Sequence, residues 1–231
     1  MTFEQGEYWI ERGRKYFQEF ADQSEALRLI FSKQEEQLWK ILEQLDLRGV
    51  ETVMEIGCGF GRISAIVLKY LVDVKLFLCV DISKSQIKRA KERLDREVDK
   101  PPYFAVGDFR KTFVRDSFDL VIASEVFLHF PPQEIKYVLR NAQEISRRML
   151  IHIDPFLVPS MTRRDRLGDF WRSLEKRVKG KPAITNWFHD FPKLYDHSLV
   201  GKITLFPIID GIQHVFVVEK ARQIPEDWGK S

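Results

Sequence analysis

The feature that most constrains the fold is a glycine-rich turn between an apolar run and a helical pattern. The run 53–56 leads into Gly57, Gly59 and Gly61, and the helical pattern begins at Arg62. Glycine tolerates positive φ angles and lets a ligand approach the main chain without a Cβ atom in the way. A strand, a glycine turn and a helix in this order predict an α/β fold with a nucleotide-cofactor site at the start of the helix.

The rest of the chain alternates short apolar runs with longer amphipathic segments, a pattern typical of βαβ units and a parallel sheet. A turn signal, Asp210-Gly211, separates the last two apolar runs and predicts a terminal hairpin. The expected strands are 52–56, 75–80, 103–106, 118–123, 149–153, 203–209 and 215–218. The expected helices are 24–45, 62–72, 84–97 and 133–146, preceded by a short amphipathic helix rich in aromatic residues.

Composition sets further bounds on the class of protein. A chain of 231 residues suits a single α/β domain. The sequence has no run of about 18 apolar residues, and it starts with acidic rather than basic residues, so we expect neither a membrane span nor a signal peptide, and a cytoplasmic location. Its two cysteines cannot form a disulfide framework. A formal net charge of +3 is too small to identify a nucleic-acid binder.

The spacing of the glycines separates two classes of cofactor. The dinucleotide fingerprint G-x-G-x-x-G requires a third glycine where this chain has Arg62. The pattern present is acid-x-Gly-x-Gly-x-Gly, opened by Glu55, and it resembles the first motif of class I S-adenosylmethionine-dependent methyltransferases. The resemblance implies a three-layer Rossmann-like fold with a mostly parallel seven-stranded sheet, an antiparallel terminal strand and helices on both faces. It also implies S-adenosylmethionine as the cofactor, S-adenosylhomocysteine as its product, and a glycine loop lying against the methionine part.

Three more segments follow in the order that this family shows. Asp81 comes about 20 residues after the glycine turn, where a carboxylate can accept both ribose hydroxyl protons. The resemblance implies that Asp108 and Phe109 meet the adenine and that the end of the fourth strand lines the cofactor and acceptor pocket. The expected cofactor-binding residues are Glu55, Gly57, Cys58, Gly59, Gly61, Asp81, Ile82, Gly107, Asp108, Phe109, Ser124 and Glu125.

Candidate bases come from the histidines, because a neutral acceptor has to lose a proton during methyl transfer. His129 follows the fourth strand at the edge where ligands bind in open α/β sheets, and His189 lies in a cluster of aromatic residues before the terminal strands. Structural roles are the alternative for both, as a helix cap or as core packing. On the fifth strand we expect Asp154 to face the pocket and His152 to face the core. No spacing of His, Asp or Glu indicates a metal site.

We read the chain as one methyltransferase domain. Tyr8, Trp9 and Arg12 belong to a candidate lid over the cofactor, and a plain amphipathic helix without that role is the alternative. The expected parts are N-terminal helices (1–48), a cofactor-binding core (49–154), an acceptor-recognition insertion (155–201) and terminal strands (202–220).

The first hypothesis for function is methylation of a small-molecule O, N or C acceptor by a monomer or homodimer. Basic runs at 163–166 and 176–181 leave RNA or protein as a second possible acceptor, although no Asn-Pro-Pro-Tyr-type tetrapeptide stands at 124–127. The sequence is also compatible with a non-catalytic S-adenosylmethionine-binding module and with an oxidoreductase on a related fold.

Overall fold

The computed structural model describes residues 3–13, 25–112, 115–156, 186–209 and 213–221. The strands are β1 (Thr52–Ile56), β2 (Leu76–Asp81), β3 (Tyr103–Val106), β4 (Phe118–Ser124), β5 (Ser146–Pro155), β6 (Val200–Ile209) and β7 (Gln213–Lys220). The described helices are α1 (Phe3–Arg12), α3 (Glu25–Gln44), α4 (Arg62–Tyr70), α5 (Lys84–Glu97), α6 (Phe109–Thr112), α7 (Pro132–Ile145) and α9 (Phe191–Leu194), with a 3-10 turn, η1 (Phe127–His129).

The seven strands form one sheet in the order β3-β2-β1-β4-β5-β7-β6. The first five run parallel, and β7 pairs antiparallel with both β5 and β6. The chain order reverses at β1, which has β2 on one side and β4 on the other. In open α/β sheets a ligand binds beyond the carboxyl ends of the strands at such a reversal. The predicted fold class is therefore confirmed, and it places the glycine turn after β1 at the expected ligand edge.

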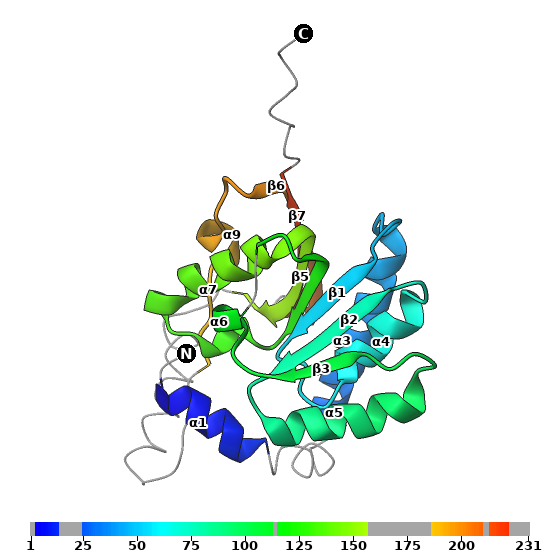
Figure 1. Ribbon diagram of the computed structural model, residues 1–231. Coiled ribbons are helices and arrows are strands. Elements are labelled where there is room, and N and C mark those ends of the chain that lie inside the picture. The colour runs from blue at the N-terminus through cyan, green and yellow to red at the C-terminus, as the bar shows by residue number, and fades with distance from the viewer. Residues whose placement is uncertain (1–2, 14–24, 113–114, 157–185, 210–212, 222–231) are drawn as a thin grey trace.

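Alternating side chains divide the interior into two apolar layers. Along β4, Leu120 and Ile122 face one layer, while Val121 and Ala123 face the other, and all four are fully buried. Helices α3, α4 and α5 pack against the first layer, and α7, α9 and η1 pack against the second. The helices thus lie on both faces of the sheet (Figure 1).

Most predicted elements agree with the structure to within a few residues. The largest difference is β5, predicted at 149–153 and observed at Ser146–Pro155, because it pairs with β4 along one side and β7 along the other. The turn at 210–211 and the basic runs lie outside the described residues, as does most of the expected insertion. None of the described helices combines the length and the apolar character needed to cross a membrane.

We predict that Ile122→Ala will lower the free energy of unfolding by about 2–5 kcal/mol, because it removes a fully buried side chain from the central strand β4. Val72→Ala is the control, since Val72 is 72% exposed and its truncation should change stability by no more than about 0.5 kcal/mol. Urea unfolding of both variants measures the difference, and similar losses in both would contradict the assignment of β4 to the core.

Candidate active site

The glycine loop after β1 combines tight packing with an open centre. Gly57, Gly59 and Gly61 have φ angles of 65°, 54° and 82°, which side-chain-bearing residues rarely adopt. A Cβ atom on Gly57 would lie 2.5 Å from Val126 Cγ2, and one on Gly61 would lie 3.1 Å from Leu94 Cδ1. A Cβ atom on Gly59 would meet no atom within 4 Å. The outer glycines therefore allow close packing, whereas the middle one borders free space.

Asp81 joins the glycine loop to the ends of β2 and β3. Its carboxylate accepts hydrogen bonds from the Gly59 N–H (2.9 Å) and the Ser83 N–H (2.8 Å), and its main-chain oxygen accepts one from the Gly107 N–H (3.0 Å). Burial raises the pKa of Asp81 to about 6, although the two main-chain hydrogen bonds oppose that shift. Each carboxylate oxygen keeps a lone pair, and the space beside Gly107 is open, so the site fits a ribose with two hydroxyl groups.

Two of the predicted cofactor residues shape the loop from inside the core. Glu55 is buried and accepts a hydrogen bond from the Ser64 hydroxyl of α4. Burial raises the pKa of Glu55 to about 8, so its carboxyl group is mostly protonated at neutral pH. Cys58 is also buried, and its main-chain N–H donates to the Val80 oxygen at 3.0 Å, which ties the loop to β2.

The segment after β3 places Asp108 in an ion pair. Arg110 donates to both carboxylate oxygens, from Nε to Oδ1 at 2.9 Å and from Nη2 to Oδ2 at 2.6 Å. Burial pushes the pKa of Asp108 upward, but the hydrogen bonds from Arg110 outweigh it and leave the pKa below its usual value. Phe109 is buried in the apolar layer beneath α7, and Ile82 is half-buried beside Asp81. Arg110, two positions after the acid, was not among the predicted site residues.

At the end of β4, the predicted residues Ser124 and Glu125 lie beside the glycine loop through their neighbour Val126. Ser124 Oγ is buried and has no hydrogen-bond partner among the described residues. Glu125 adopts a φ of 55°, and its main-chain N–H donates to the Ile153 oxygen at 2.7 Å. A non-glycine residue in this conformation is strained, and such strain tends to occur at functional sites.

Helix α1 extends across the carboxyl edge of the sheet, and its role as a lid stays a prediction. The ring centroids of Trp9 and His129 are 4.8 Å apart, and His129 is the last residue of η1. At the other end of the helix, a Cβ atom on Gly13 would lie 2.1 Å from Ser83 Oγ, so the chain there nearly touches the start of α5. Helix α1 thus runs from the end of β4 to the end of β2, beyond the carboxyl ends of the strands (Figure 1).

The two candidate bases have different surroundings. Burial lowers the pKa of His129 to about 4, and its Nδ1 atom has no hydrogen-bond partner among the described residues. Burial also lowers the pKa of His189 to about 4, but His189 Nε2 lies 3.0 Å from the Phe130 oxygen, to which it donates. Two residues before His189, the main-chain N–H of Trp187 donates to the Leu128 oxygen at 2.7 Å. His189 therefore helps to hold the turn that carries His129.

A buried hydrogen-bonded chain lies behind this turn. Tyr195 Oη is 2.6 Å from His152 Nε2, His152 Nδ1 is 2.8 Å from Asp154 Oδ2, and Asp154 Oδ1 accepts the Leu128 N–H at 3.0 Å. Burial raises the pKa of Asp154 and Tyr195 and lowers that of His152, which favours a chain without net charge. The prediction that Asp154 faces the pocket is wrong, since its side chain is fully buried and supports the turn. The core position of His152 is confirmed.

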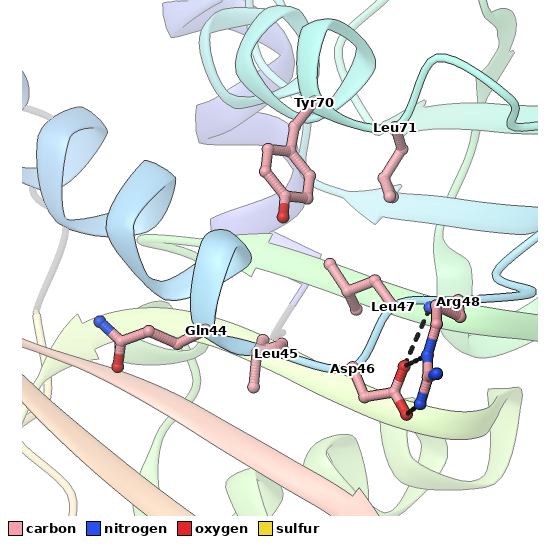
Figure 2. A pocket seen from close by; sticks show the side chains of 7 residues that line it. All are labelled: Gln44, Leu45, Asp46, Leu47, Arg48, Tyr70 and Leu71. Carbon is pink, nitrogen blue, oxygen red and sulfur yellow. Dashed lines mark hydrogen bonds and ion pairs between the residues drawn. The ribbon is translucent and has the colours of Figure 1, made fainter.

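A cavity of about 550 Å³ lies at the opposite edge of the sheet, between the ends of α3 and α4. Figure 2 shows Tyr70 and Leu71 pointing toward Leu47, with the ion pair of Asp46 and Arg48 at the rim. This cavity adjoins the amino ends of the strands, so it is separate from the glycine loop. Among the described residues, no three His, Cys, Asp or Glu side chains are grouped in a way that could hold a metal ion.

The open glycine loop and Asp81 lie together at the reversal point of a Rossmann-like sheet, and their geometry fits an adenosyl group. Residues 54–148 match the family described as "Methyltransferase domain". No curated protein sequence matches the chain.

Solved structures of similar fold include magnesium protoporphyrin IX methyltransferase (ChlM) from Synechocystis PCC 6803 with bound SAH. It is 16% identical, with a TM-score of 0.64 over 93% of this chain and 97% of that one. The PH0226 protein from Pyrococcus horikoshii OT3 is 20% identical, with a TM-score of 0.59 over 86% and 93% of the two chains. The mitomycin 7-O-methyltransferase MmcR is 17% identical, with a TM-score of 0.61 over 95% of this chain and 67% of that one. These solved structures share the fold of this chain, and the match to the methyltransferase family model is confined to residues 54–148.

We predict that Asp81→Asn will weaken binding of S-adenosylhomocysteine roughly 10- to 100-fold, because an amide cannot accept hydrogen bonds at both positions. In the unsubstituted protein, the affinity for S-adenosylhomocysteine should fall as the pH is lowered through about 6. Protonation of the Asp81 carboxylate then removes one of its two hydrogen-bond-accepting oxygens. Isothermal titration calorimetry across this pH range tests both statements. Unchanged affinity of the variant would remove Asp81 from the site.

We predict that Tyr195→Phe will destabilise the protein by about 1–3 kcal/mol, because it leaves the buried His152 Nε2 without its partner. Tyr137→Phe is the matched control, since Tyr137 is 60% exposed and its variant should stay within about 0.5 kcal/mol of the original stability. Chemical unfolding of the two variants provides the measurement. Equal stabilities would mean that the buried chain is not a structural support.

Proposed function

We propose that this protein transfers the methyl group of S-adenosylmethionine to a small-molecule acceptor. The observation that carries the proposal is the arrangement at the carboxyl edge of the sheet. There the open side of Gly59 and the carboxylate of Asp81 lie between α5 and η1, and α1 crosses the same edge with Trp9 against His129. A helix that covers the cofactor edge restricts the room for a bulky acceptor and favours a small one.

When bound, S-adenosylmethionine supplies a methyl group that its sulfonium already activates, so the protein mainly has to orient the acceptor and exclude water. Trp9 and the turn η1 are placed to do this on the acceptor side. The glycine loop and Asp81 would hold the cofactor on the other side. In-line displacement needs both groups to be held at once, and the Gly57–Val126 contact fixes the two sides relative to each other.

His129 is the base that the geometry favours. Its pKa of about 4 leaves the imidazole neutral, and therefore able to accept a proton, at neutral pH. The Asn186 side chain and the Glu125 main chain hydrogen-bond to its ring, but its Nδ1 atom lacks a partner among the described residues, whereas His189 Nε2 donates to the Phe130 oxygen. We therefore assign proton removal from a hydroxyl or amine acceptor to His129, and the support of η1 to His189.

Similar folds with printed small-molecule activities support this acceptor class, because ChlM acts on magnesium protoporphyrin IX and MmcR is named for mitomycin. The competing function is methylation of RNA or protein, which the basic runs at 163–166 and 176–181 favour. Those runs lie outside the described residues, so the geometry of the covered edge carries more weight.

We predict that methyl-labelled S-adenosylmethionine, supplied with a library of hydroxyl- and amine-bearing metabolites, will give a labelled product of low mass. A parallel reaction with total RNA and unfolded protein is the control, and it should remain unlabelled. Label found only in the macromolecular fraction would contradict the small-molecule assignment and favour the competing function.

We predict that His129→Asn will lower kcat about 10²- to 10⁴-fold while the affinity for S-adenosylhomocysteine stays within about twofold. His189→Asn should affect stability more than kcat, because its ring bonds a main-chain oxygen of the turn. Steady-state kinetics on the acceptor found above gives the comparison. If His189→Asn lost more activity than His129→Asn at equal stability, the two roles would be reversed.

A further inference from the structure

A buried glutamine connects the N-terminal part of the chain to the ligand edge. Gln34 of α3 is fully buried, and its Nε2 donates to Glu125 Oε1 at 3.1 Å and to Gln213 Oε1 at 2.8 Å. Gln213, the first residue of β7, donates from its own Nε2 to the same Glu125 oxygen at 3.0 Å. Neither glutamine lies in the segment 54–148 that matches the family. Three separate parts of the chain therefore meet at one carboxylate oxygen.

Arg62 fixes the direction of this network. Its Nη2 donates to Gln34 Oε1 at 2.6 Å, and its Nη1 lies 3.3 Å from Glu35 Oε1. A guanidinium has only donors, so the Gln34 oxygen must face Arg62 and the Gln34 amide hydrogens must face Glu125 and Gln213. The charge at the start of α4 thus determines which way the Gln34 amide points.

The network uses only one oxygen of Glu125. Oε1 accepts both glutamine amides, and no described residue donates a hydrogen bond to Oε2. The side chain is half-buried, and the next residue, Val126, packs on Gly57 of the cofactor loop. A partly desolvated carboxylate with a free oxygen is best satisfied by a cation that can donate hydrogen bonds.

We propose that Gln34 and Gln213 are positioning residues that aim the free oxygen of Glu125 at the ammonium group of the cofactor's methionine part. The sulfonium is the cofactor's other cation, but it has no hydrogen to donate, so the ammonium is the better partner. This assignment rests on the proposed function, because the glycine loop has to hold the methionine part nearby. The specificity for the amino-acid end of the cofactor then depends on α3 and β7.

The test compares two ligands by calorimetry on the full chain. S-adenosylhomocysteine contains the ammonium group, whereas 5′-methylthioadenosine keeps the adenosine and the thioether but lacks the amino acid. Glu125→Gln and Gln34→Leu should each weaken S-adenosylhomocysteine binding roughly tenfold, the effect of losing about one charge-assisted hydrogen bond. Both variants should leave 5′-methylthioadenosine binding within about twofold. Gln44→Leu, at the exposed end of α3, is the matched control and should bind both ligands as the unsubstituted protein does.

The outcomes separate this inference from the proposed function. If the unsubstituted protein did not bind S-adenosylhomocysteine, the proposed function itself would fail. Equal losses for both ligands would show that the glutamines act only on overall structure, and unchanged affinities would show that they do not position Glu125. Should Gln34→Leu fold poorly, Gln213→Leu removes the other donor, and combining it with Glu125→Gln should cause little loss beyond Glu125→Gln alone. A full additional loss in that double variant would overturn the proposal.

Discussion

The contact between Gly57 and Val126 is the constraint on which the rest of the site depends. Any side chain at Gly57 would collide with Val126, so the turn after β1 and the turn after β4 can approach only because this position has none. The approach brings the glycine loop and the segment Glu125–His129 into a fixed relation across the two central strands. The absence of a Cβ atom at Gly57 thus allows the part of the site that would hold the methyl donor to pack against the part that would hold the methyl acceptor.

Polar groups, rather than apolar packing alone, hold the acceptor side in place. The turn η1 is bonded through Leu128 to Asp154 on β5 and to Trp187, and through Phe130 to His189. Directional hydrogen bonds of this kind set the position of a short turn more sharply than apolar contacts, which tolerate sliding. Asp154 is hydrogen-bonded to His152, and His152 to Tyr195. The hydrogen-bonded chain that supports the turn therefore extends to Tyr195, shortly before the terminal strands.

The sequence was sufficient to predict the elements that follow local rules. Alternation and helical spacing predicted the sheet and its main helices, and the glycine pattern and Asp81 predicted residues that the structure brings into contact after β1 and β2. What the sequence could not give depends on contacts between distant segments. The burial of Asp154 follows from its pairing with η1, and the role of Gln34 from contacts with residues 91 and 179 positions away. A single glutamine on an amphipathic helix carries no local sign of such partners.

The ion pair of Asp108 and Arg110 shows another limit of sequence patterns. The motif placed an acid after β3, and the structure has one there, but the neighbouring arginine occupies both of its oxygens. A pattern match identifies the residue type at a position without giving its electrostatic surroundings. Any ligand group beside Asp108 would therefore meet a carboxylate that Arg110 already holds in place and partly neutralises.

The reversed direction of β7 affects which residues can be exchanged at the carboxyl edge of the sheet. In a wholly parallel sheet only the last residues of strands reach the ligand, and they are followed by the helices that build the core. Because β7 runs the other way, its first residue, Gln213, stands at that edge, where it pairs with Ile209 at the end of β6. New side chains can thus be introduced at that edge by changing the first residue of β7, at little risk to the apolar layers beneath.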